Sequence, residues 1–144
     1  MIQQDTIKLL RECDSGVKMG VASIDDVIDN VESELFRRRL SSCRTEHVKL
    51  GDEIQSQLCR FHDDGKDPNP IVKGMSWMKT NMKLGLENSD NTVADLMTDG
   101  CNMGVKSLNR YLNEYMAADE YSKDITKRLI NLEEKLAVDI RQFL

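Results

Sequence analysis

One short phrase occurs twice in this chain, and the repeat constrains the fold more than any other feature does. Residues 13–18 read Cys-Asp-Ser-Gly-Val-Lys, and residues 101–106 read Cys-Asn-Met-Gly-Val-Lys. Each copy lies in a long segment with helical periodicity, and a second segment of this kind follows it. These second segments also correspond, since residues 49–54 and 135–140 both begin with Lys-Leu and end with Ile. A duplicated helix pair predicts an all-α four-helix bundle.

Apolar residues spaced three and four positions apart indicate where the helices lie. The first stripe predicts a helix over residues 5–31, and the second predicts one over 33–62. A third helix is expected over residues 91–117, and a fourth carries its apolar face from Ile125 to Phe143. Because the join between the first two helices is short, they are predicted to be antiparallel neighbours.

The segment between the two helix pairs is predicted to be a long crossover. Residues 63–70 are dense in turn-forming residues, and residues 71–86 carry apolar side chains at helical spacing. A crossover of this length lets the second and third helices run parallel in an up-down bundle. We therefore expect a single domain over residues 1–144, made of a helix pair at 5–62, a crossover at 63–89 with a short amphipathic helix, and a helix pair at 90–144.

Two pairs of glycines suggest that the first and third helices approach each other closely. Gly16 and Gly20 lie one turn apart on the first helix, and Gly100 and Gly104 lie one turn apart on the third. Glycine inside a helix costs about 1 kcal/mol relative to alanine. Its presence in both copies favours a packing role, although isolated glycines also occur in helices that simply tolerate them.

Charge and hydropathy argue against several classes of function. The 144-residue chain has a net charge of −5, and its only basic run is Arg37–Arg39 on a predicted helix. Nucleic-acid binding needs a clustered positive field. No apolar run approaches the length of a membrane span, and the N-terminus has no signal-peptide pattern. We therefore expect a cytoplasmic protein with reduced cysteines and without nucleic-acid or membrane partners.

The spacing of several residues is familiar from one group of proteins. The relevant features are Leu9-Leu10 before Cys13-Asp14 and Gly16, then Gly65 and Pro68, then Trp77, then Asp99-Gly100-Cys101. This order resembles a ferritin-like family of bacterial proteins of unknown function, and the resemblance covers almost the whole chain. The resemblance implies an up-down bundle with a crossover and, in many ferritin-like proteins, a di-iron centre.

The ligands of a di-iron centre can be checked one by one. Such a centre requires Glu-x-x-His on two of its helices. Arg44 stands three residues before His47, and Leu136 stands three residues after Glu133. The other histidine, His62, lies at a predicted helix end. The sequence therefore predicts degenerate ligands and no ferroxidase centre, and it assigns Glu133 to an exposed helix face.

One polar residue interrupts the apolar stripe of the second helix. His47 lies one turn from Cys43, and Cys101 is expected at nearly the same height if the second and third helices start level. Two thiols and an imidazole are credible ligands for zinc or another soft metal. The alternative is that the cysteines pack as small apolar residues and that His47 is satisfied by a neighbouring group. In that case we expect His47→Leu to be tolerated.

The crossover carries the strongest candidate for an interaction surface. Met75, Trp77, Met78 and Met82 give it an apolar face, and methionine suits an adaptable docking surface. This face either covers one end of the bundle or contacts a second copy of the chain. Because closed two-fold pairing is the commonest assembly of soluble chains, the sequence predicts a homodimer that uses residues 71–86.

The functional expectation follows from what the helices carry. No paired carboxylates, phosphate loop or Ser/His/Asp arrangement is apparent, which favours a protein without enzymatic activity. We expect a non-catalytic ferritin-like interaction or structural protein without a cofactor. The alternative is a metal- or thiol-dependent protein that uses Cys43, His47 and Cys101 in the bundle core.

Overall fold

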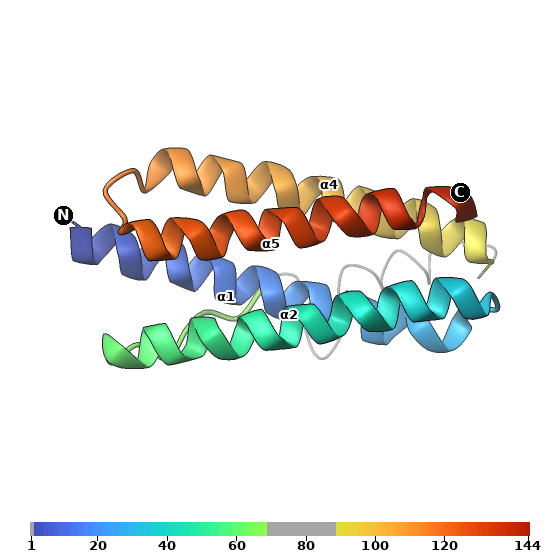
Figure 1. The fold of residues 1–144 in the computed structure, drawn as a ribbon, viewed down its shortest axis with the longest axis horizontal. Coiled ribbons are helices and arrows are strands. Elements are labelled where there is room, and N and C mark those ends of the chain that lie inside the picture. The colour runs from blue at the N-terminus through green and yellow to red at the C-terminus, as the bar shows by residue number, and fades with distance from the viewer. Residues whose placement is uncertain (1, 69–88) are drawn as a thin grey trace.

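The computed structural model describes residues 2–68 and 89–144, and its four long helices pack side by side into an elongated bundle (Figure 1). Short 3-10 turns follow the first and the last of these helices, at Ile28–Asn30 and Arg141–Phe143. The described residues contain no strand. The helices are α1 at Ile2–Val27, α2 at Glu34–Arg60, α4 at Asp90–Glu114 and α5 at Glu120–Asp139. The predicted all-α four-helix bundle is confirmed.

Helices α2, α4 and α5 each begin at a capping side chain. The capping residues are Ser33, Ser89 and Asp119, and each accepts a hydrogen bond from the backbone N–H three residues further on. This bond satisfies one of the amide groups that have no partner inside the helix. The starts of these three helices therefore follow from local sequence, and they lie within a few residues of the predicted ones.

The direction of each helix can be followed in Figure 1. α1 and α2 are antiparallel, as are α4 and α5, whereas α2 and α4 run in the same direction. α2 and α4 also start level, because the Asp90 carboxylate accepts hydrogen bonds from the backbone N–H groups of Glu32 at 2.9 Å and Ser33 at 3.0 Å. The parallel and level arrangement expected from a crossover is therefore present, while residues 69–88 lie outside the described part of the chain.

The buried apolar side chains form two clusters, one toward each end of the bundle. The cluster near the C-terminus includes Ile24, Phe36, Leu40, Val93, Met97, Leu136 and Ile140. The cluster toward the N-terminus includes Leu10, Val17, Leu50, Ile54, Leu108, Ile125 and Leu129. All four helices contribute to both clusters, so burial of these side chains along the whole length holds the bundle together.

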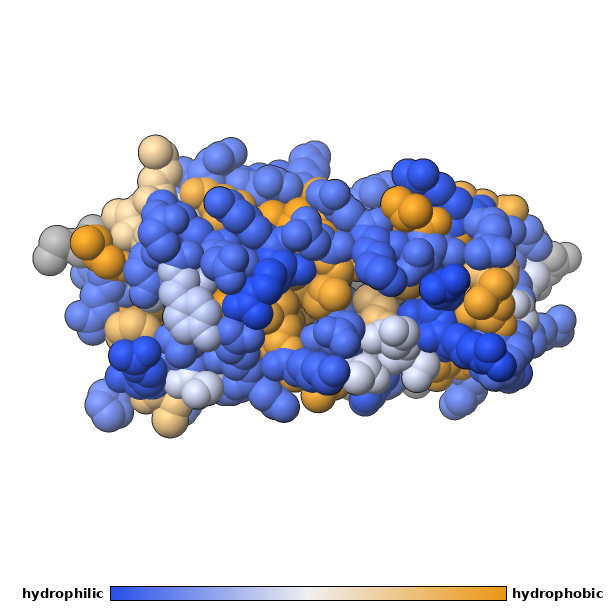
Figure 2. All heavy atoms as spheres, in the orientation of Figure 1, coloured by the Kyte–Doolittle hydropathy of each residue, from blue (hydrophilic) through white to orange (hydrophobic). Residues whose placement is uncertain are grey.

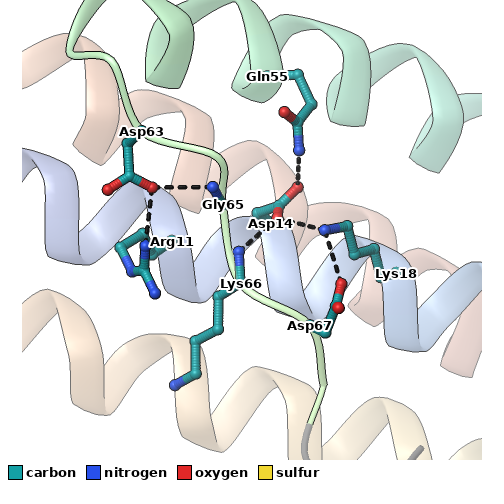
Figure 3. A network of polar contacts seen from close by, with 8 residues as sticks. All are labelled: Arg11, Asp14, Lys18, Gln55, Asp63, Gly65, Lys66 and Asp67. Carbon is teal, nitrogen blue, oxygen red and sulfur yellow. Dashed lines mark hydrogen bonds and ion pairs between the residues drawn. The ribbon is translucent and has the colours of Figure 1, made fainter.

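After α2, residues 63–68 cross the surface of α1, and we call this segment the strap. The buried carboxylate of Asp14 on α1 accepts hydrogen bonds from the Gln55 side chain at 2.6 Å and from the backbone N–H of Lys66 at 2.8 Å, and Lys18 lies 2.8 Å away (Figure 3). Gly65 has a φ of +93°, and a Cβ there would collide with Asp14. The strap therefore follows a path that only glycine permits at this point.

The outer surface is mainly polar. Figure 2 shows one face on which hydrophilic side chains predominate and apolar side chains appear in scattered groups between them. Within residues 2–68 and 89–144, no helix combines the length and the apolar character that a membrane span requires.

Candidate functional site

A polar layer lies between the two apolar clusters, and each helix contributes one residue to it. α2 supplies His47 and α5 supplies Glu133, whereas α1 and α4 supply Gly20 and Gly104. A Cβ at Gly20 would lie 2.8 Å from the His47 ring, and a Cβ at Gly104 would lie 3.7 Å from Glu133. Glycine at position 20 therefore makes room for the histidine side chain, which is 1% exposed.

Both nitrogens of the His47 ring have a hydrogen-bond partner. Nε2 lies 2.7 Å from Oε1 of Glu133, and Nδ1 lies 2.8 Å from the backbone carbonyl oxygen of Cys43. The Cys43 Sγ is a further neighbour at 3.4 Å from Nδ1. A doubly protonated ring satisfies this geometry, because both partners at the shorter distances are oxygen acceptors. The arrangement thus suits an imidazolium that donates in two directions.

The environment favours the charged form of His47. Burial by itself lowers its pKa, but the hydrogen bonds to Cys43 and Glu133 and the negative charge of Glu133 outweigh this and raise the pKa to about 10. At neutral pH the ring is therefore protonated, and His47 and Glu133 form an ion pair inside the bundle.

Two further thiols lie in the core. Burial raises the pKa of Cys101 strongly, and the charge of Glu133 and a hydrogen bond with it act in the same direction. Burial likewise raises the pKa of Cys13 to about 12, and its Sγ lies 3.1 Å from the Thr126 hydroxyl. Both groups are therefore neutral thiols with little nucleophilic character. Cys13 belongs to the cluster toward the N-terminus, away from the polar layer.

The structure therefore brings together the residues that the sequence singled out. His47 and Cys101 both interact with one further residue, Glu133, and Cys43 lies close to His47 and to Cys101. Cys43 and Cys101 also belong to the same apolar cluster, as expected from helices that start level. The predicted proximity of the three candidates is thus present, but the carboxylate that connects them was not predicted.

The assignment of Glu133 to an exposed face is wrong. Its side chain is only 13% exposed, and it lies four residues after Leu129 and three before Leu136, both buried in the core. The repeat held a signal for this position. The 86-residue offset that relates residues 49 and 135 also relates His47 to Glu133, so equivalent positions of the two halves meet in the core.

The cluster is arranged for hydrogen bonding rather than for metal ligation. A metal-bound imidazole must offer a nitrogen lone pair, whereas both nitrogens of His47 face oxygen acceptors. Within the described ranges 2–68 and 89–144, no three His, Cys, Asp or Glu side chains are placed to hold a metal ion. Binding of zinc by Cys43, His47 and Cys101 would therefore require one of these two hydrogen bonds to be broken, because only one ring nitrogen can ligate the metal in this cluster.

A cavity of about 340 Å³ opens beside the polar layer, between α1 and α4. The expected close approach of these two helices at their glycines is wrong for this region. Leu129 of α5 is the only described residue within 4 Å of the Cβ position at Gly16, and the nearest atoms at Gly104 belong to Glu133, also on α5. The missing side chains leave space between α1 and α4 rather than a tight contact.

The predicted interaction surface of Met75, Trp77, Met78 and Met82 lies outside the described residues. The homodimer that was expected to use residues 71–86 therefore stays a prediction. Similarity to known proteins adds no identification, because no protein-family model matches the chain and no curated protein matches its sequence.

Proposed function

We propose that this chain is a non-catalytic ferritin-like bundle that acts as an interaction or structural protein. The observation that supports this most directly is the His47–Glu133 ion pair. In ferritin-like metal proteins, inward-facing carboxylates and histidines of the bundle core are metal ligands. Here the inward-facing histidine of α2 and the glutamate of α5 engage each other, with their charges matched.

The state of the cysteines agrees with this proposal. The pKa values of Cys13 and Cys101 are raised mainly by burial, so neither thiol is prepared for nucleophilic or redox chemistry at neutral pH. All four cysteines are free thiols. Free thiols are typical of reducing compartments, and we propose a cytoplasmic location on that ground.

The proposed mode of interaction is self-association through residues 71–86. Light scattering on the wild type and on the double variant Met78→Glu/Met82→Glu tests it. We expect a dimeric wild type and a monomeric variant, because two carboxylates would be forced into an apolar contact. A monomeric wild type at micromolar concentration contradicts the dimer, and a variant that stays dimeric places the interface elsewhere.

One observation favours the alternative, a metal- or thiol-dependent protein. Two thiols, an imidazole and a carboxylate meet in one place, and these are the donor types that zinc prefers. Elemental analysis of protein purified from its native host without chelators separates the two proposals. We expect no stoichiometric metal. One zinc per chain that is lost in His47→Leu would establish the alternative, and two irons per chain would contradict both proposals.

A further inference from the structure

The cavity between α1 and α4 is large compared with the packing defects of ordinary cores. Its volume of about 340 Å³ falls in the range of small-molecule pockets, whereas a dry cavity of about 150 Å³ already admits benzene. α1 and α4 form its two long walls, Leu129 and Glu133 of α5 line it from the third side, and Lys66 and Pro68 of the strap also line it.

The glycines that create this space are not all required by packing within the described chain. At Gly20 a methyl group would collide with His47, at 2.8 Å. At Gly16 and Gly104, by contrast, a methyl group would lie 3.5 Å from Leu129 and 3.7 Å from Glu133, which are ordinary contacts. Alanine would fit at both positions and would favour the helix. Glycine there keeps open a volume that the described side chains do not fill.

The charges along the cavity are paired. Inside it, Glu133 is neutralised by His47 at 2.7 Å, and beside the strap Glu12 is neutralised by Lys66 at 2.5 Å. A charged ligand would therefore find no free counter-ion among these groups and would lose its hydration. The charge pattern selects an uncharged ligand.

The remaining lining is mainly apolar and polarisable. Met19, Met97 and Met103 contribute thioethers, and Leu108 and Leu129 contribute branched aliphatic surface. Methionine adapts to the shape of a neighbour and makes favourable contacts with aromatic rings. Hydroxyl groups of Ser15 and Ser107 also line the cavity and can bind one polar substituent.

We propose that the α1/α4 cavity binds a small, uncharged, mainly apolar molecule of about two fused rings, or a chain of equal volume. The cavity volume indicates the size of the molecule. The pairing of Glu133 with His47 and of Glu12 with Lys66 indicates that the molecule is uncharged, and the thioether lining indicates that it is mainly apolar. The lining residues named here do not depend on metal content, so the site goes beyond the interaction role proposed above.

Titration of the wild-type chain with prodan, an uncharged two-ring fluorophore, tests the proposal. We expect a blue shift in emission, one molecule bound per chain, and a Kd of about 0.2 mM or tighter from the usual affinity per ligand atom. The anionic naphthalene dye 1,8-ANS should bind at least about tenfold more weakly. No prodan binding, or equal binding of both dyes, overturns the proposal.

Matched variants locate the site. Gly104→Leu fills the cavity and should weaken prodan binding at least about tenfold, whereas Asn102→Leu adds the same side chain at an exposed position of α4 and should leave it unchanged. If circular dichroism shows that Gly104→Leu is unfolded, Gly104→Ala replaces it, with a smaller loss expected. If Asn102→Leu and Gly104→Leu weaken prodan binding equally, the proposed site is wrong.

The double variant Met78→Glu/Met82→Glu provides a further test. If this variant binds prodan but the wild type does not, the proposal is also wrong, because the chain's own segment would then be the occupant.

Discussion

Asp14 and Glu133 are carboxylates with little exposure to solvent, and they are neutralised in different ways. Asp14 lies under the strap and has several partners, among them a backbone N–H, an amide and Lys18, whose side chain remains 37% exposed. Glu133 lies between the two apolar clusters, and its cationic partner is His47, which is 1% exposed. The cationic partner of the first carboxylate is accessible to water, whereas the cationic partner of the second is not.

This difference separates two uses of a buried charge. The Asp14 network determines the path of a surface segment, because its donors come from α1, α2 and the strap (Figure 3). The Glu133 pair places matched charges in the interior, where either charge alone would be costly. Loss of one partner should therefore have a small effect at Asp14 and a large effect at Glu133.

The largest effect is expected for His47→Leu. The variant leaves Glu133 without its cation in a mostly buried position, and we expect the free energy of unfolding to fall by about 3 kcal/mol. Urea denaturation measures it. This reverses the tolerance expected from the apolar stripe alone, because that expectation took no account of the carboxylate on α5.

Two controls isolate the pair. The double variant His47→Leu/Glu133→Leu removes both charges and should recover much of the lost stability, giving a clear coupling in a double-mutant cycle. Arg44→Leu breaks the exposed pair with Asp25 and should change stability little. If His47→Leu alone is as stable as the wild type, the proposed difference between Asp14 and Glu133 is wrong.

The pair should also make stability depend on pH. The pKa of His47 is about 10 in the folded protein and 6.5 ordinarily, so the folded state holds an extra proton between these values. The stability that the His47–Glu133 pair contributes should therefore be fully present below about pH 6.5. It should decrease as the pH rises toward 10, by at most about 1.4 kcal/mol per pH unit. Urea midpoints at pH 6, 7, 8 and 9 measure this.

The double variant His47→Leu/Glu133→Leu provides the reference for this slope. Cys13 and Cys101, whose pKa values are raised, also reduce stability as the pH rises above their ordinary value of 9.0. Both cysteines are retained in the double variant, and burial is the main cause of their raised pKa values, so up to pH 9 the difference between the two proteins mainly reports the pair. A difference that stays constant from pH 6 to 9 would mean that His47 is not the titrating group.

Alanine at the two glycines of the polar layer should have opposite effects. Gly20→Ala places a methyl group 2.8 Å from the His47 ring and should destabilise the protein by about 1–3 kcal/mol. Gly104→Ala makes an ordinary contact at 3.7 Å and should stabilise it by up to about 1 kcal/mol through helix propensity. Thermal melts of the two variants decide this, and effects of the same sign would show that the layer is not shaped as described.

The smallest effect is expected for Lys18→Met. It removes the cation beside Asp14 but retains the amide of Gln55 and the backbone N–H of Lys66. Because Lys18 is more than one-third exposed, the loss should be below about 1 kcal/mol. Urea denaturation together with trypsin cleavage at Lys66 measures stability and strap release. A loss as large as that of His47→Leu would contradict the comparison.

The sequence by itself determined the helices and much of their arrangement. Periodic apolar residues and the caps at Ser33, Ser89 and Asp119 are local signals, so they predict helix positions without tertiary information. The broken Glu-x-x-His pattern around His47 is equally local. The ferritin-like assignment, the homodimer and the metal alternative stay predictions, because no described contact tests them.

Only the tertiary structure decided how the interior is used. A charged residue such as Glu133 is normally assigned to a surface, and its burial depends on a cation that α2 supplies 86 residues away in sequence. Helical glycine is compatible both with close packing and with empty space, and the neighbours of Gly20 and Gly104 distinguish the two cases. Periodicity reports which face of a helix turns inward, but the partner that meets each inward residue depends on how the four helices pack.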